Sequence, residues 1–208
     1  MTKREFFKNE LLKMLETKLK KFGFRLNKSL SEFTKNNSSG WQKYQIIFLL
    51  TDGGWQVHPA IFIRFNLVED LFHKISGFEK KYCKGTPTIG ISIENYNSNE
   101  IPSRFDVTEE SQINEISDKL FILFENIALP FYEKYNTLET INQAMNNIPN
   151  DVSLTGPIFK GTKSLIVAKL LNDPHYYQLK NRYLEYYRDF SKGFYLPEYT
   201  ALVKLLDG

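Results

Sequence analysis

The segment GPIFKGTKS, residues 156–164, comes close to a phosphate-binding loop, in which backbone amides and a lysine hold the phosphates of a nucleotide. Gly156 and Gly161 have the required spacing. Thr162, however, separates Gly161 from Lys163, whereas the lysine of such a loop directly follows the second glycine. We therefore predict a loop that leads into a helix with Thr162 near its N-cap, and no nucleotide site.

Four polar side chains form a second candidate. Gln56, His58 and Arg64 have the same parity on one predicted strand and so share a face, and Glu94 lies on another predicted strand. A histidine in such a setting could titrate near neutral pH. Two interpretations stay open: a partly exposed polar face, or a polar pocket that binds a small molecule or hydrolyses it.

Other catalytic and metal-binding patterns are missing from the sequence. The three histidines, His58, His73 and His175, stand far apart and lack the spacing of a zinc helix. No strand carries the paired carboxylates that a nuclease uses to hold a divalent ion, and no G-x-S-x-G motif occurs. We expect a protein without catalytic residues, metal ligands or cofactor.

The triplet Gly-Trp-Gln occurs twice, at residues 40–42 and 54–56, and contains both tryptophans of the chain. If a short turn joins the two strands, Trp41 and Trp55 would lie almost opposite each other. Such a cross-strand aromatic pair stabilises a hairpin by about 0.2–1 kcal/mol. The alternative is that the two rings line a binding patch at the open end of the hairpin.

The elements that position these side chains follow from hydrophobic periodicity. A helix over residues 2–22 is closed by Gly23, and a second helix starts at Asn66 in a capping box with Glu69. Strands are predicted over residues 24–33, 41–50, 55–65, 86–95 and 105–107. Thr108 is expected to cap a long helix that is ended or kinked at Pro130, and helices follow over residues 138–145, 162–171, 174–190 and 197–206.

Strands grouped before helices indicate an α+β fold. We expect an N-terminal helix, a mostly antiparallel sheet of about 4–5 strands with a packing helix, and a helical C-terminal half. The length fits a single domain over residues 1–208, within which residues 137–208 could form a helical subdomain.

Composition narrows the class of partner. A net charge of +3, with few arginines, disfavours a nucleic-acid binder, which carries a concentrated basic surface. No apolar run reaches the length of a membrane span. The single cysteine, Cys83, excludes an intramolecular disulfide and fits a reducing compartment, so we expect a cytoplasmic protein without membrane contact.

Several phrases resemble an uncharacterised type of bacterial domain of unknown function: GFRLNKSLSEF, GWQKYQIIF, FIRFNLVEDLF and SLIVAKLLNDPHYYQLKNRYLEY. Small α+β proteins of this kind include immunity proteins of polymorphic toxin systems. The resemblance covers most of the chain but contains no diagnostic motif, so no functional residue is carried over. It implies a non-enzymatic protein that binds another protein, and the binding candidates stay Trp41, Trp55, Gln56, His58, Arg64 and Glu94.

Overall fold

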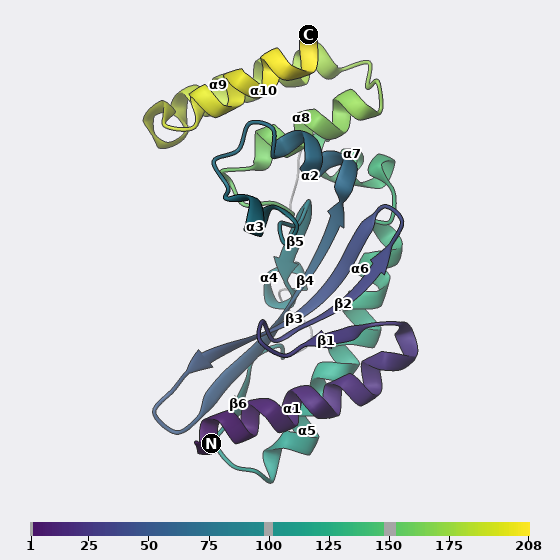
Figure 1. The fold of residues 1–208 in the computed structure, drawn as a ribbon, viewed down its shortest axis with the longest axis vertical. Helices are drawn as coiled ribbons and strands as arrows, with labels where there is room; N and C mark the ends of the chain where they lie inside the picture. Colours follow the sequence, from purple (N-terminus) through teal and green to yellow (C-terminus); the bar gives the residue numbers. More distant parts are fainter. Residues whose placement is uncertain (1, 98–101, 148–152) are drawn as a thin grey trace. The chain divides into compact units, whose positions relative to one another are not determined.

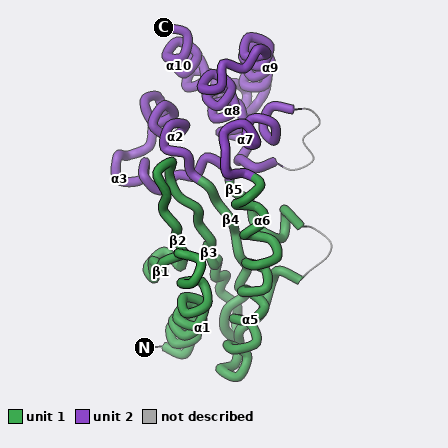
Figure 2. Tube along the Cα trace, turned by 90° about the vertical axis from the view of Figure 1, so that its right-hand side faces the viewer, with its two compact units in different colours: residues 1–63, 90–134 green, residues 64–89, 135–208 purple. Residues whose placement is uncertain are grey.

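The computed structural model describes residues 2–97, 102–147 and 153–208 and has the expected α+β fold (Figure 1). An N-terminal helix is followed by an antiparallel sheet and then by a helical C-terminal half. The chain divides into two compact units, residues 1–63 with 90–134 and residues 64–89 with 135–208 (Figure 2).

The first unit contains most of the sheet. The strands of the sheet are β1 (Arg25–Asn27), β2 (Glu32–Asn37), β3 (Gly40–Leu50), β4 (Trp55–Phe65), β5 (Ile89–Ser92) and β6 (Phe105–Val107), and of these only residues 64, 65 and 89 belong to the second unit. The order is β1-β2-β3-β4-β5, and β6 also pairs with β4. The pairs β1–β2, β2–β3 and β4–β6 are antiparallel, with Phe33 opposite Tyr44 and Gln56 opposite Asp106.

The helices of the first unit are α1 (Lys3–Leu19), α4 (Ile93–Tyr96), α5 (Gln112–Leu123) and α6 (Leu129–Lys134). Gly23, with φ of 85°, closes the 3₁₀ turn that follows α1, in agreement with the prediction that it ends this helix, and Thr2 and Glu5 form a capping box at the start of α1. A π turn, Phe124–Ala128, joins α5 to α6 just before Pro130. The wider turn accommodates the proline, which has no N–H to donate.

The core of the first unit lies between one face of the sheet and these helices. Tyr44 is fully buried, and its hydroxyl donates to the backbone oxygen of Leu120 at 2.7 Å. Phe124 contacts the rings of Phe24 and Tyr44 edge-on. These aromatic and polar contacts fix the register of α5 against the sheet.

The second unit is helical. Its elements are α2 (Asn66–Phe72), α3 (Lys80–Cys83), α7 (Leu138–Asn146), α8 (Lys160–Leu170), α9 (Tyr176–Asp189) and α10 (Leu196–Asp207). Helix α8 is central, because every residue from Gly161 to Ala168 is buried. The hydroxyl of Tyr187 on α9 accepts from the amides of Gly161 and Thr162, and so receives two of the N–H groups that the first turn of α8 leaves without a helical partner.

The structure corrects the predicted ends of several elements. The strand predicted over residues 24–33 is two strands, β1 and β2, because Ser31 adopts φ of 55° in the turn between them. The strand predicted over residues 86–95 is only β5, because Ser92 caps the short helix α4. Helix α5 starts at Gln112 rather than after a Thr108 cap, since the Gln112 side chain accepts from the amides of Thr108 and Glu109.

We expect Gly161→Ala to destabilise the second unit by about 1–3 kcal/mol, because a Cβ at this position would lie 2.6 Å from the Tyr187 ring. Replacing a helical glycine by alanine normally raises the free energy of unfolding by about 1 kcal/mol. A decrease in this free energy for Gly161→Ala would therefore show the clash with Tyr187. Gly156→Ala is the matched control, because nothing lies within 4 Å of its added Cβ. Urea unfolding measures both, and a more stable Gly161→Ala variant would contradict the packing.

Candidate functional site

The two faces of the sheet have different environments. Tyr44 contacts α5, and because side chains alternate along a strand, Phe48 shares its face. The ring of Trp55 packs edge-on against Phe48, and its Nε1 donates to the backbone oxygen of Arg4 on α1 at 2.9 Å. Trp55 therefore lies on the face that the helices cover, which we call the helix face, and it fastens the hairpin to α1.

Trp41 lies on the opposite face and at the other end of the hairpin. It is three residues before Tyr44, it pairs with Asn36 of β2, and Lys43 lies over its ring at 4.4 Å. The nine residue steps of β3 between Trp41 and the turn span about 30 Å. The expected tryptophan pair is wrong, because a hairpin places the first residues of its two strands at opposite ends.

The structure brings together three of the predicted polar residues, Gln56, His58 and Glu94, around Arg104. The Nε of Arg104 donates to Glu94 at 2.7 Å, and its Nη1 donates to Gln56 at 3.1 Å. The amide of Gln56 donates in turn to Asp106 at 3.3 Å. We call Gln56, His58, Glu94 and Arg104 the strand-face cluster.

Arg104 was missed in the sequence analysis. It precedes a three-residue strand whose register with β4 no local pattern specifies. The pairing of Gln56 with Asp106 brings Arg104 beside β4, and without that pairing its position two residues before Asp106 carries no signal.

His58 has an unusual place in the strand-face cluster. It is 8% exposed, and its Nδ1 is buried without a hydrogen-bond partner. Burial lowers the pKa of the imidazole below its ordinary value, the positive charge of Arg104 lowers it further, and Glu94 partly opposes the effect. The neutral ring therefore keeps a donor or acceptor at Nδ1 that the described residues do not use.

Arg64, predicted to share this face, takes part in a separate network in the second unit. Its Nη1 donates to the backbone oxygens of Cys83 and Thr86 at 2.8 Å, and its Nε donates to Asn66 at 2.8 Å. The side chain is 4% exposed. Arg64 thus fastens the segment that follows α3 and does not extend the strand-face cluster.

Glu69 is the centre of that network, and the capping box predicted for it is absent. The residue before α2 is Phe65, and it makes no side-chain cap. The fully buried Glu69 carboxylate accepts from Thr86 at 2.7 Å and from Thr88 at 3.1 Å, and it pairs with Lys163 at 2.9 Å. A carboxylate can be buried in this way because its charge is both paired and hydrogen-bonded.

Lys163, the lysine of the loop-like motif, therefore points into the second unit. Its ammonium lies over the rings of Phe72 and Phe159 at 4.9 and 5.3 Å, and it also donates to the backbone oxygen of Pro87. Burial lowers the pKa of Lys163, and the charge of Glu69 opposes this shift. Helix α8 already begins at Lys160, so Thr162 lies inside the helix, where its hydroxyl donates to Phe159.

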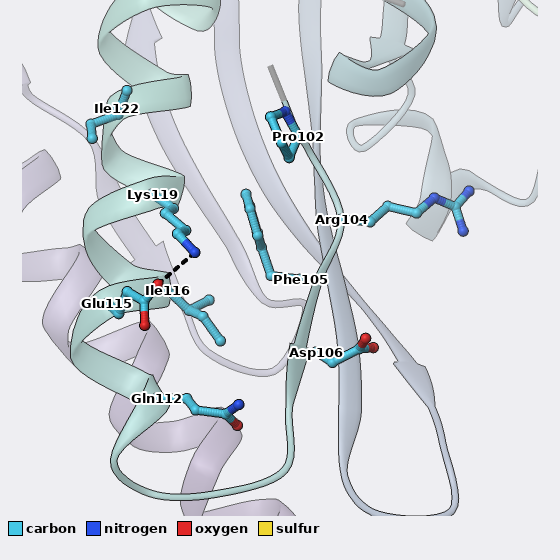
Figure 3. A pocket seen from close by; sticks show the side chains of 9 residues that line it. All are labelled: Pro102, Arg104, Phe105, Asp106, Gln112, Glu115, Ile116, Lys119 and Ile122. Carbon is cyan, nitrogen blue, oxygen red and sulfur yellow. Dashed lines mark ion pairs between the residues drawn. The ribbon is translucent and has the colours of Figure 1, made fainter. Parts of the chain in front are cut away.

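A groove with a volume of about 530 Å³ lies between β6 and α5 in the first unit (Figure 3). Phe105 points from β6 into this groove toward Ile116 and Ile122 of α5, whereas Arg104 and Asp106 point away from it. Lys119 pairs with Glu115 at 2.6 Å on the helix side. Ile122, at the rim of the groove, is 47% exposed.

The backbone of Asp106 faces away from the sheet. The carbonyl oxygen of Val107 lies close to Gly54, the residue directly before β4, because a Cβ added to Gly54 would be 2.0 Å from this oxygen. The Val107 carbonyl therefore points toward β4. In an antiparallel pair the backbone groups alternate in direction, so the N–H and C=O of Asp106 point to the other edge of β6. Among the residues that the structure describes, β6 pairs only with β4.

Comparison of the chain with models of protein families, with curated proteins and with solved structures finds no match. Within the described ranges, no helix is long and apolar enough to cross a membrane. The same residues contain no group of three or more His, Cys, Asp or Glu side chains placed to hold a metal ion.

We expect Lys163→Met to destabilise the protein by about 3 kcal/mol, because it removes the closest cation of the buried Glu69 carboxylate and leaves only Arg64, at 3.9 Å, to balance that charge. Glu69→Gln in the same chain should recover part of the loss. Lys81→Met is the control, since its pair with Glu79 is exposed and contributes at most about 1 kcal/mol. Equal losses in urea unfolding for Lys163→Met and Lys81→Met would contradict this account.

The lowered pKa of His58 predicts a loss of stability in acid. The unfolded chain, with an ordinary pKa of about 6.5, binds a proton that the folded protein binds only at lower pH. The stabilisation that comes from keeping His58 neutral in the folded protein is therefore complete above pH of about 6.5, and it is lost as the pH falls through the pKa of the folded state. His58→Gln should reduce the acid loss of unfolding free energy, and a ring-proton titration by NMR should give a midpoint below 6.5. A higher midpoint would contradict the assignment.

Proposed function

We propose that this chain is a non-catalytic protein-binding domain that takes an extended segment of another polypeptide into the groove between β6 and α5. The observation that carries the proposal is the combination of an outward-facing N–H and C=O at Asp106 with the apolar groove beside it. In strand addition, an exposed edge supplies backbone hydrogen bonds and an adjacent pocket takes alternate side chains of the peptide.

The chemistry of the edge favours a polypeptide over a small apolar ligand. A ligand that filled only the space between Phe105, Ile116 and Ile122 would leave the Asp106 backbone unpaired. A strand would satisfy that donor and acceptor and would direct every second side chain into the groove. Strand addition therefore uses both features at once.

The compartment and the class of partner belong to the same proposal. A single cysteine, Cys83, fits the bacterial cytoplasm, where thiols stay reduced. The resemblance to small α+β immunity proteins supports a role in binding another protein, because such proteins act by binding a toxin. We infer an immunity-like binding role on these grounds.

A second candidate function is the binding of a small molecule at the strand-face cluster, and the buried, unpartnered Nδ1 of His58 favours it. Arg104, half exposed beside His58, would supply a charged donor. A ligand that reaches Nδ1 would move the His58 titration midpoint. Repeating that titration with a panel of metabolite carboxylates and phosphates tests this candidate, and an unmoved midpoint throughout would dismiss it.

The groove is tested with a phage-displayed library of random linear peptides selected on the full chain. We expect enriched peptides whose affinity, measured by fluorescence anisotropy, falls at least about tenfold with Ile122→Glu, because a charge replaces apolar contact at the rim. Leu67→Glu is the control, since Leu67 is 65% exposed and belongs to the second unit, whereas the groove belongs to the first.

Two variants at one position isolate the backbone contact. Asp106→Ala removes only the carboxylate, whereas Asp106→Pro also removes the outward N–H without breaking a hydrogen bond to β4. Asp106→Pro should bind the selected peptides about fivefold more weakly than Asp106→Ala does. This factor corresponds to the loss of one hydrogen bond of about 1 kcal/mol. Equal affinities, or no loss with Ile122→Glu, would overturn strand addition.

A further inference from the structure

We propose that the edge of β6 pairs with the same edge of a second copy of this chain, in an antiparallel two-fold arrangement centred on Phe105. The inference rests on the proposed function, because it uses the same edge and groove, and it names a partner for them. Its basis is the charge order of the edge, Arg104-Phe105-Asp106.

Two-fold symmetry makes that order self-complementary. With Phe105 opposite Phe105 of the second copy, antiparallel pairing sets each Arg104 opposite an Asp106. Directly opposite side chains have Cβ atoms about 4.5–5.5 Å apart, which is within reach of an ion pair. An edge whose two charges had the same sign would repel its own copy.

The backbone has the matching register. The N–H and C=O of Asp106 point outward, and Arg104 has the same parity. In the proposed arrangement Asp106 and Arg104 of the second copy form a hydrogen-bonded pair on either side of the axis. The Phe105 pair at the axis is then the non-hydrogen-bonded kind, in which side chains approach most closely.

Each charged side chain keeps unused capacity. Arg104 uses its Nε for Glu94 and its Nη1 for Gln56, and no described residue accepts from its Nη2. Asp106 uses Oδ1 for Gln56, and its Oδ2 accepts no hydrogen bond from the described residues. New pairs across the axis would therefore add to the present contacts without replacing them.

The apolar side chains at the edge would also contact their counterparts in the second copy. Phe105 and Ile122 of each copy line the groove at the edge, and their counterparts would enter the same region across the axis. Because each edge strand has only three residues, we expect a weak dimer of the smaller interface class.

The test is charge exchange, followed by sedimentation equilibrium over a range of protein concentrations. Arg104→Asp or Asp106→Arg alone would set like charges opposite each other at two places and should weaken dimerisation at least about tenfold. The double variant Arg104→Asp/Asp106→Arg restores opposite charges and should restore the dimer. Gln56 can serve either arrangement, because its amide both donates and accepts.

A mixture of the two single variants gives a sharper result. One edge then carries two acidic side chains and the other two basic ones, so the variants should associate with each other while each alone stays monomeric. Glu133→Arg is the control for net charge, because it makes the same change as Asp106→Arg at an exposed position of α6.

The outcomes separate the two proposals. A wild-type chain that is monomeric up to about 1 mM, or a dimer that the single variants leave intact, would overturn the self-pairing. The peptide selection on the groove would still stand or fall by Ile122→Glu. Peptides that bind the groove while the chain stays monomeric would keep strand addition and reject the second copy as its partner.

Discussion

Strand β4 has to satisfy its backbone on two edges, and this requirement organises the first unit. One edge pairs with β3, and the other pairs with β6 over residues 55–57 and with β5 further along. Pro59 has the parity of Trp55 and Val57, so its missing N–H falls on the second edge, beyond the last residue that β6 pairs. A proline in an eleven-residue strand is tolerated because two short strands share that edge.

That sharing has a consequence for binding. β6 is three residues long, so it covers little of β4, and among the described residues its own outer edge has no paired strand. A longer continuous strand there would have completed the sheet with a broad flat edge, which invites unspecific pairing. The short strand instead presents the outward N–H and C=O of Asp106, beside an apolar groove and next to two charged side chains.

The sequence predicted the elements better than the contacts between them. Helix α1 could be predicted because its apolar residues follow one stripe and Gly23 marks its C-terminal end. The role of Glu69 could not be predicted, because a glutamate three residues after an asparagine fits a capping box as well as a buried ion pair. What decides is Lys163, 94 residues away, whose position depends on the packing of α8 against α2. Arg104 was missed for the same reason, because its neighbours are set by long-range pairing. Parity along β4 correctly places His58 and Arg64 on one face, but it does not show that the two side chains contact different neighbours.

Charges at a sheet edge usually keep strands apart, and Arg104 and Asp106 at first fit that role. Whether these two charges repel or attract an incoming strand depends on the order of the charges that this strand carries. A neutral strand gains no ion pair from them and must desolvate both, a singly charged strand gains at most one pair, and a strand with two charges of opposite sign in the matching order gains two. The β6 sequence is such a strand when it runs antiparallel to itself, so the charges that exclude most partners are the ones that admit a second copy. Specificity would then come from the order of two charges around Phe105, and the apolar groove would supply most of the burial.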